Sequence, residues 1–251
     1  FLQVSYYEVA IASPHYNNNN IIIALTMTNK STTAGDVLLY VPNLIGYLRV
    51  ICSVLSLTLM ICFPQMWITA IILYVSSFIG DLFDGLAARK FDQCSLFGGL
   101  LDMVTDRCST AGLLCALSHE HRERPILVLL FTMLIILDIS SHWCQMYFTA
   151  SFKQHHKSAE GNQNSFALVR WYYSYYYFFG YCCVGTEFTY VAIYILANVT
   201  SLDQYETIRI GCEYFLMISI PACITKQIVN ISQLCSACHA VAANDAEQKN
   251  K

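Results

Sequence analysis

Charged residues are scarce in this 251-residue sequence. Lys, Arg, Asp and Glu together make up 12% of it, whereas hydrophobic residues make up 56%. In a typical soluble domain roughly a quarter of the residues are charged. The charges are also unevenly spaced, and several uncharged runs are long enough to cross a bilayer, which takes about 20 apolar residues. The sequence therefore excludes an ordinary soluble protein and predicts an integral membrane protein.

A surplus of positive charge is also absent. The formal net charge is −3, so we expect no nucleic-acid partner. No internal repeat is evident. Residues 1–36 contain no long apolar run: the stretch 21–27 is too short to span a membrane, and no basic region precedes it as it would in a signal peptide. We interpret 1–36 as an N-terminal extension, either disordered or an artefact of the gene model.

The twelve cysteines do not form a disulfide framework in our interpretation. They are scattered through apolar runs, where cysteine behaves as a small hydrophobic residue, whereas disulfide scaffolds are typical of short secreted chains. Cys235-Ser-Ala-Cys238-His239 has the spacing of a c-type haem attachment site. Haem attachment needs an exported soluble domain and a distal ligand, and neither is visible. The motif favours a plain helix end instead.

Six apolar segments after residue 36 predict an all-α integral membrane protein with six transmembrane helices. Polar or turn-forming residues separate them, and they lie at about 43–63, 66–88, 96–118, 125–150, 174–197 and 208–234. We expect a six-helix domain over 37–238, followed by a C-terminal tail over 239–251. An even number of spans places both termini on the same side of the membrane.

The distribution of basic residues predicts which side that is, because cytosolic loops carry an excess of Lys and Arg. With both termini in the cytosol, the cytosolic segments hold eight basic residues: Lys30, Arg89, Lys90, Lys153, Lys157, Arg170, Lys249 and Lys251. The opposite face holds Arg122, Arg124 and Arg209. Arg49, Arg107 and Lys226 lie within spans and are not counted. We therefore predict cytosolic termini.

Four aspartates lie within the second and third predicted spans. Ionisable groups inside a span are costly and indicate a functional site. Asp81 and Asp84 are three residues apart, and Asp102 and Asp106 are four apart, so each pair lies on one helix face. Two facing carboxylate pairs would repel each other unless a cation neutralised them, and an all-oxygen site suits Mg²⁺ or Mn²⁺. The pattern predicts a metal site between helices 2 and 3, at the cytosolic side.

The residues around these acids fit a ligand that contains phosphate. Gly85 and Gly98 lower helix propensity, which suggests close approach of a ligand or backbone. Arg89 lies one turn beyond Gly85 and can donate two parallel hydrogen bonds to phosphate. Ala88 leaves room beside it, and Ser95 offers a hydroxyl from the connecting loop.

Together these residues form the pattern Asp81-x2-Asp84-Gly85-x2-Ala88-Arg89-x8-Gly98-x3-Asp102-x3-Asp106. At every defined position it resembles the signature of the CDP-alcohol phosphatidyltransferase family. The likeness extends over about residues 38–245 and is closest to the phosphatidylinositol synthases of eukaryotes. Further matching stretches are Val41-Pro-Asn-Leu-Ile-Gly-Tyr-Leu-Arg49, 101–110, Asp138-Ile-Ser-Ser-His142-Trp143, His156-Lys157, Gly161-Asn162, Arg170-x-Tyr172-Tyr173 and Gly185-x-Glu187. Two positions depart from the pattern: Tyr176 replaces a basic residue, and Ser95 replaces Thr.

This resemblance implies a phosphatidyl transfer from CDP-diacylglycerol to myo-inositol, with release of CMP. It implies that two divalent cations, Mg²⁺ or Mn²⁺, are held by the four aspartates, with Asp106 taking the proton of the attacking hydroxyl. Gly85, Ala88, Arg89, Ser95 and Gly98 would bind CDP-diacylglycerol. The family likeness also implies a homodimer in contact with membrane lipid, located in the endoplasmic reticulum with its active site facing the cytosol.

Asp138 and His142 form a second polar pair inside a predicted span. They could contact the inositol hydroxyls or support other residues of the site, and an ordinary hydrogen bond between helices is an equally good interpretation.

Three alternatives remain open at this stage. The acceptor alcohol could be glycerol phosphate, serine, choline or ethanolamine. The protein could instead be a cation transporter without enzymatic activity, although Arg89 next to the carboxylates argues against a cation path. An inactive homologue is the third alternative, and the intact Asp106 argues against it.

Overall fold

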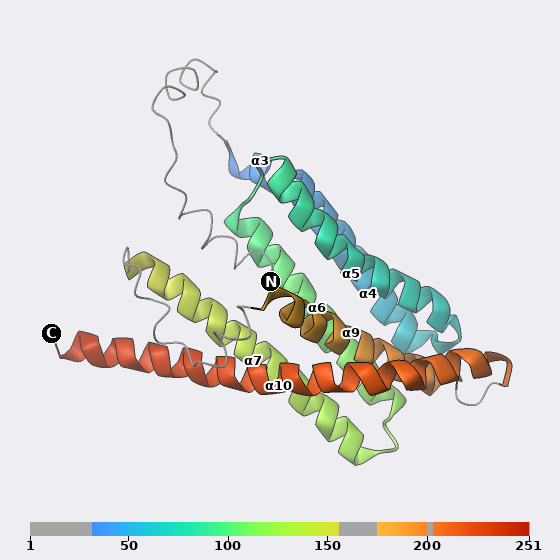
Figure 1. The fold of residues 1–251 in the computed structure, drawn as a ribbon. Helices are drawn as coiled ribbons and strands as arrows, with labels where there is room; N and C mark the ends of the chain where they lie inside the picture. The colour runs from blue at the N-terminus through green and yellow to red at the C-terminus, as the bar shows by residue number, and fades with distance from the viewer. Residues whose placement is uncertain (1–31, 156–174, 200–202, 251) are drawn as a thin grey trace. The chain divides into compact units, whose positions relative to one another are not determined.

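The computed structural model describes residues 32–155, 175–199 and 203–250, which form helices and no strand. The prediction of an all-α chain is therefore confirmed for the described residues (Figure 1). The helices are α3 (Ala34–Leu38), α4 (Val41–Cys62), α5 (Trp67–Lys90), α6 (Leu96–Glu120), α7 (Pro125–His155), α9 (Tyr176–Val199) and α10 (Glu206–Lys249), with short 3-10 turns η2 (Pro64–Met66) and η3 (Asp203–Tyr205). The matching stretches at 156–157, 161–162, 170 and 172–173, and the side chain of Tyr176, lie outside the described residues.

Five of these helices are long and apolar enough to cross a membrane: α4, α5, α7, α9 and α10. This supports an integral membrane protein. Helix α6, at 25 residues, is long enough, but its charge sets it apart. Every 18-residue window of α6 contains Asp106 and Arg107 together with either Asp102 or Glu120. Among the described residues, five of the six predicted spans thus correspond to helices that could cross a membrane. The remaining span, α6, stays a prediction.

The helix boundaries differ from the predicted ones at both ends of the chain. Helix α3 begins within the predicted extension, because Thr33 caps its first turn and exchanges hydrogen bonds with Asp36. The backbone hydrogen bond from Thr33 lowers the pKa of Asp36. The expected helix end near residue 238 is wrong, since α10 continues to Lys249. At 1.5 Å per residue a helix of this length measures about 66 Å, roughly twice the apolar thickness of a bilayer.

The chain divides into two compact units. Among the described residues, the first contains 32–59 and 68–109, and so includes most of α4 and α5 and the first half of α6. A short turn joins α5 to α6: Asp92 has a φ of 53°, and the Gln93 amide donates to the Ala88 carbonyl over 2.9 Å. This is the usual left-handed helix stop, in which Asp is tolerated better than most residues. The turn reverses the chain after α5, between the two aspartate pairs.

Serine hydroxyls join the three helices of the first unit. The Ser53 hydroxyl on α4 lies 2.8 Å from that of Ser77 on α5 and 2.7 Å from that of Ser109 on α6. The Ser77 hydroxyl also lies 3.0 Å from the backbone carbonyl of Arg49, to which it donates. Small hydroxylated residues let helices in an apolar environment approach closely and bond across the contact. These bonds fix α4 against the two helices that carry the aspartates.

The second unit contains residues 60–67 and the chain from 110 onward, in which α10 packs along α9 and α7 (Figure 1). A Cβ atom placed on Gly185 of α9 would lie 2.7 Å from the Ala222 Cβ of α10, so the two helices touch at small residues. Pro221 lies inside α10 and lacks an N–H group. Nearby, the Tyr181 hydroxyl of α9 donates to the Ile218 carbonyl over 2.6 Å. Close α9–α10 packing therefore depends on Gly185.

We expect Gly185→Ala to destabilise the second unit by about 1–3 kcal/mol, because the helices must move apart to admit the methyl group. Gly180→Ala is the matched control on the same helix: nothing lies within 4 Å of a Cβ atom there, so alanine should be neutral or stabilising by up to about 1 kcal/mol. Thermal unfolding of both variants in detergent measures the difference. Equal midpoints would show that the α9–α10 contact is not close.

Candidate active site

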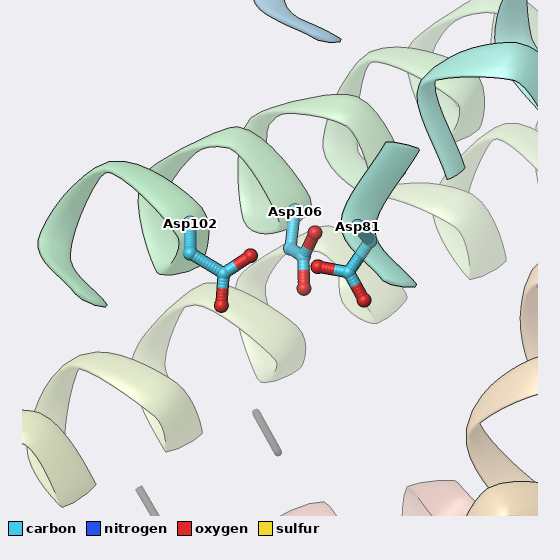
Figure 2. A group of neighbouring side chains, drawn as sticks. All are labelled: Asp81, Asp102 and Asp106. Carbon is cyan, nitrogen blue, oxygen red and sulfur yellow. The ribbon is translucent and has the colours of Figure 1, made fainter. Parts of the chain in front are cut away.

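The four predicted acids lie on two helices of the first unit, Asp81 and Asp84 on α5 and Asp102 and Asp106 on α6. Asp81, Asp102 and Asp106 each offer one carboxylate oxygen such that the three oxygens lie within 4.8 Å of one another. Figure 2 shows Asp102 and Asp106 extending from one helix and Asp81 from another, with their carboxylates turned toward a shared space. The predicted facing of the two pairs is therefore present, and the oxygens are close enough together to hold a metal ion.

Arg49 of α4 lies among the four aspartates. Its Nη1 atom is 2.5 Å from Asp84 and 2.8 Å from Asp102. Its Nη2 atom is 2.6 Å from Asp106 and 3.1 Å from Asp81. Each terminal nitrogen thus contacts one carboxylate from α5 and one from α6. The guanidinium joins all four acids and both helices.

The charges of this cluster do not balance. The Arg49 side chain is 3% exposed and those of the aspartates are 11–26% exposed, so solvent screens them weakly. Besides Arg49, Arg107 lies 3.7 Å from the second oxygen of Asp106. Four acidic side chains therefore face two basic ones. Such an excess of carboxyl groups in a partly buried site favours binding of a divalent cation, and carboxylate oxygens are the ligands that Mg²⁺ and Mn²⁺ prefer.

A hollow opens beside the cluster, and it brings together five of the predicted site residues with five that were not assigned a role. Its lining consists of Asp84, Ala88, Ser95, Gly98 and Asp102 together with Pro42, Asn43, Gly46, Gln93 and Leu101. All of these residues belong to the first unit. The two acids in its lining, Asp84 and Asp102, place the hollow directly beside the carboxylates that could hold a metal ion.

Ser95 and Gly98 shape this hollow through local structure. Ser95 directly precedes α6, and its hydroxyl accepts a hydrogen bond from the Gly98 amide over 3.0 Å, the typical arrangement of a helix N-cap. A Cβ atom on Gly98 would lie 3.0 Å from the Asn43 Oδ1 atom and 3.1 Å from the Ser95 hydroxyl. A side chain at 98 would therefore crowd Asn43 and Ser95, and the Ser95 hydroxyl already has a bonding role.

Asn43 is a residue whose importance was not seen in the sequence. It is 1% exposed, and its amide nitrogen donates to the Val37 carbonyl over 2.5 Å. Its Oδ1 atom is buried and has no hydrogen-bond partner in the described structure. A buried unsatisfied acceptor is costly, so this oxygen in the wall of the hollow is suited to a donor on a ligand or a water molecule.

The other predicted residues lie in different parts of the structure. Arg89 is exposed at the end of α5, and its guanidinium lies near Gly85, where a Cβ atom would be 3.6 Å from Arg89 Nη1. Asp138 and His142 belong to the second unit. The His142 Nδ1 atom lies 2.7 Å from the Asp138 carbonyl and 3.5 Å from its carboxylate. The structure thus joins these two residues to each other, within a unit that does not contain the four aspartates.

Arg49, like Asn43, is a residue of the site that was not predicted from the sequence. It is the one charged residue of the apolar helix α4, and an isolated charge inside a span indicates a functional site. That signal was available. Which residues Arg49 meets, however, depends on the packing of α4 against α5 and α6, which the sequence pattern does not give.

Comparison with known proteins agrees with this geometry. The family model described as CDP-alcohol phosphatidyltransferase matches residues 39–201, which include all four aspartates and Arg49. No solved structure matches the chain significantly.

Curated relatives match over most of their length. An Arabidopsis thaliana protein named "Probable CDP-diacylglycerol--inositol 3-phosphatidyltransferase 2" is 38% identical, over 90% of this chain and 99% of the relative. A second Arabidopsis thaliana protein, "CDP-diacylglycerol--inositol 3-phosphatidyltransferase 1", is 36% identical, over 86% of this chain and 94% of the relative. The Candida albicans protein named "CDP-diacylglycerol--inositol 3-phosphatidyltransferase" is 36% identical, over 89% of this chain and 91% of the relative. With the aspartate cluster in place and the family model covering more than half of its residues, the chain belongs to the CDP-alcohol phosphatidyltransferase family.

Proposed function

We propose that this protein is a phosphatidylinositol synthase, which transfers the phosphatidyl group of CDP-diacylglycerol to myo-inositol and releases CMP. The observation that carries the proposal is the combination of the aspartate cluster with relatives that are named for this reaction. The match over 91–99% of those three relatives means that it is not confined to a shared nucleotide-binding part. This nearly full-length match to proteins named for inositol transfer favours inositol over the other acceptor alcohols.

We assign the metal-binding role to the four aspartates Asp81, Asp84, Asp102 and Asp106. Their oxygen ligands and uncompensated negative charge fit Mg²⁺ or Mn²⁺. When bound, a pair of such ions would neutralise the diphosphate and stabilise the charge on the departing CMP. Gly85, Ala88, Arg89, Ser95 and Gly98 form the proposed CDP-diacylglycerol site, in which the exposed Arg89 is the phosphate ligand and Gly98 leaves space.

Asp106 is the proposed general base. It removes the proton of the attacking inositol hydroxyl while that oxygen forms a bond to the phosphorus of the phosphatidyl group. The bond from this phosphorus to the oxygen of CMP breaks, and CMP leaves with the electron pair. Direct displacement needs no covalent enzyme intermediate. Asp106 belongs to the group of three carboxylates whose oxygens lie within 4.8 Å of one another.

The remaining assignments rest on the family likeness. Asp138 and His142 are proposed to contact inositol or to support the residues that do. The proposed protein is a homodimer of the endoplasmic reticulum membrane that takes its lipid substrate laterally. The proposed six-helix domain covers 37–238 and follows the extension 1–36, and its last helix continues through the proposed tail 239–251 as far as Lys249.

The acceptor is tested with a panel of radiolabelled alcohols. Membranes that contain the protein and CDP-diacylglycerol should convert inositol to lipid and leave serine, glycerol phosphate, choline and ethanolamine unused.

Chelation should abolish the transfer and Mg²⁺ or Mn²⁺ restore it. Asp81→Asn and Asp102→Asn, which insert normally but lose a charged ligand, serve as inactive controls. Transfer to another alcohol, or full activity in excess chelator, would contradict the proposal.

The proposed topology places both termini and the α5–α6 turn in the cytosol. A tag added after Lys251 should be digested by protease in sealed microsomes, whereas a tag inserted between α9 and α10 should be protected until detergent is added. The physical basis is the excess of Lys and Arg on the cytosolic side. The reverse pattern of protection would move the active site to the lumen.

Asp106→Asn tests the general base. The amide keeps the shape and one metal-binding oxygen but cannot accept the proton, so kcat should fall by about 10²–10⁴-fold. Binding of CDP-diacylglycerol should change much less, because the other proposed ligands remain. Arg89→Ala should do the reverse and weaken nucleotide binding more than kcat.

The two constants must be measured together at saturating metal, because Asp106 is also a proposed metal ligand. If Asp106→Asn loses nucleotide affinity in step with kcat, its role is metal ligation and another group takes the proton.

A further inference from the structure

We infer that Arg49 is a built-in counter-cation of the aspartate cluster. Without a divalent cation its guanidinium holds the four carboxylates together, and a divalent cation has to displace it from some of them in order to bind. The inference rests on the metal site of the proposed function and concerns a residue that has no role in that proposal.

The contacts of Arg49 are those of a crosslink rather than of a single ion pair. Nη1 bridges Asp84 of α5 and Asp102 of α6, and Nη2 bridges Asp81 of α5 and Asp106 of α6, with all four distances between 2.5 and 3.1 Å. The oxygens of Asp81, Asp102 and Asp106 lie within 4.8 Å of one another, and ionised carboxylates this close in a partly buried site repel one another strongly. Arg49 supplies the positive charge that allows α5 and α6 to bring them together before a metal ion arrives.

Arg49 and a metal ion compete for the same oxygens. The three aspartates that could hold an ion are Asp81, Asp102 and Asp106, and Arg49 contacts every one of them. Mg²⁺ requires oxygen ligands at about 2.0–2.1 Å, so an ion bound between Asp81 and Asp106 needs the space next to Nη2, which lies 3.1 and 2.6 Å from these two residues. The guanidinium and the ion cannot both keep their full set of contacts.

The surroundings of Arg49 hold its backbone in place and leave one nitrogen of its guanidinium group, Nε, without a hydrogen bond. The Ser77 hydroxyl bonds the Arg49 carbonyl, and the side chain crosses α5 at Gly80, where a Cβ atom would lie 2.7 Å from Arg49 Cγ. Within the guanidinium group, the Nε atom is buried and has no hydrogen-bond partner in the described part of the chain. An unsatisfied buried donor is costly, so a guanidinium that shifts to a new acceptor, such as a substrate phosphate, regains a bond.

Arg107 provides a matched control. It carries the same charge next to the same cluster, but its ion pair with Asp106 is 3.7 Å long and involves the oxygen that Arg49 does not contact. If only the local positive charge mattered, neutralising either arginine would have a similar effect on metal affinity. If Arg49 occupies the position of the ion, neutralising Arg49 has the larger effect.

The experiment compares wild type, Arg49→Met, Arg49→Lys and Arg107→Met as purified full-length proteins stripped of metal. Arg49→Met should lower the metal-free unfolding midpoint by about 5 °C or more, because four carboxylates lose their common partner. It should also tighten Mn²⁺ binding by about tenfold, against less than about threefold for Arg107→Met. Arg49→Lys, which keeps the charge without the two-nitrogen fork, should lie between wild type and Arg49→Met. Mn²⁺ affinity is measured from the spin-resonance signal of free Mn²⁺, without substrate.

Equal midpoints and affinities for Arg49→Met and wild type would overturn the inference, and so would equal affinities for Arg49→Met and Arg107→Met. If Arg49→Met does not fold, the same comparison is made between Asp84→Asn and the double variant Arg49→Met/Asp84→Asn, in which one negative charge is removed as well. Unchanged Mn²⁺ affinity in the double variant overturns the inference. Failure of wild type to bind Mn²⁺ would instead refute the metal site of the proposed function, and the metal-free midpoints would still decide whether Arg49 holds the cluster together.

Discussion

The first unit depends on one set of contacts, in which the four aspartate carboxylates share the two terminal nitrogens of Arg49. A buried charge is tolerated only where a partner of opposite sign lies in contact with it. Arg49 contacts all four aspartates, so the positions of α4, α5 and α6 are coupled at this point. The serine bonds one turn further along α4 hold the same three helices. The polar site is therefore part of what assembles this unit, as well as the place where we propose the chemistry occurs.

The same constraint explains why α6 differs from the other long helices. Its charged residues make it a poor membrane span by itself, whereas α4 and α5 are strongly apolar outside the cluster. A helix of this kind is stable in a bilayer only when neighbouring helices compensate its charges. Asp102 and Asp106 meet Arg49, and the proposed metal ions would supply the remaining charge. The predicted insertion of α6 would thus depend on the site.

The sequence predicted the helices well, because long apolar runs bounded by polar residues leave little choice in a bilayer. It also predicted the facing of the aspartate pairs, since helix periodicity places residues three and four apart on one face. It did not predict the extent of α10, which continues beyond the predicted span 208–234 to Lys249 and keeps Ser236 and Ala240 buried. The contacts of Arg49 and Asn43 were missed for a different reason: they depend on which faces of separate helices meet, and no local spacing records that.

Several residues in and between the two halves of the aspartate pattern have a structural role, whether or not they also contact a ligand. Ser95 fits a hydroxyl-bearing position of a substrate site, yet its hydroxyl caps α6. Gly98 fits a position of close ligand approach, and the atoms that exclude a side chain there belong to Asn43 and Ser95. Asp92, between the two halves of the pattern, adopts the left-handed conformation that reverses the chain. A residue of such a pattern can thus be required because it shapes the turn and so positions the carboxylates. It need not touch the substrate. This argues for separating ligand affinity from stability whenever a residue of this turn is replaced.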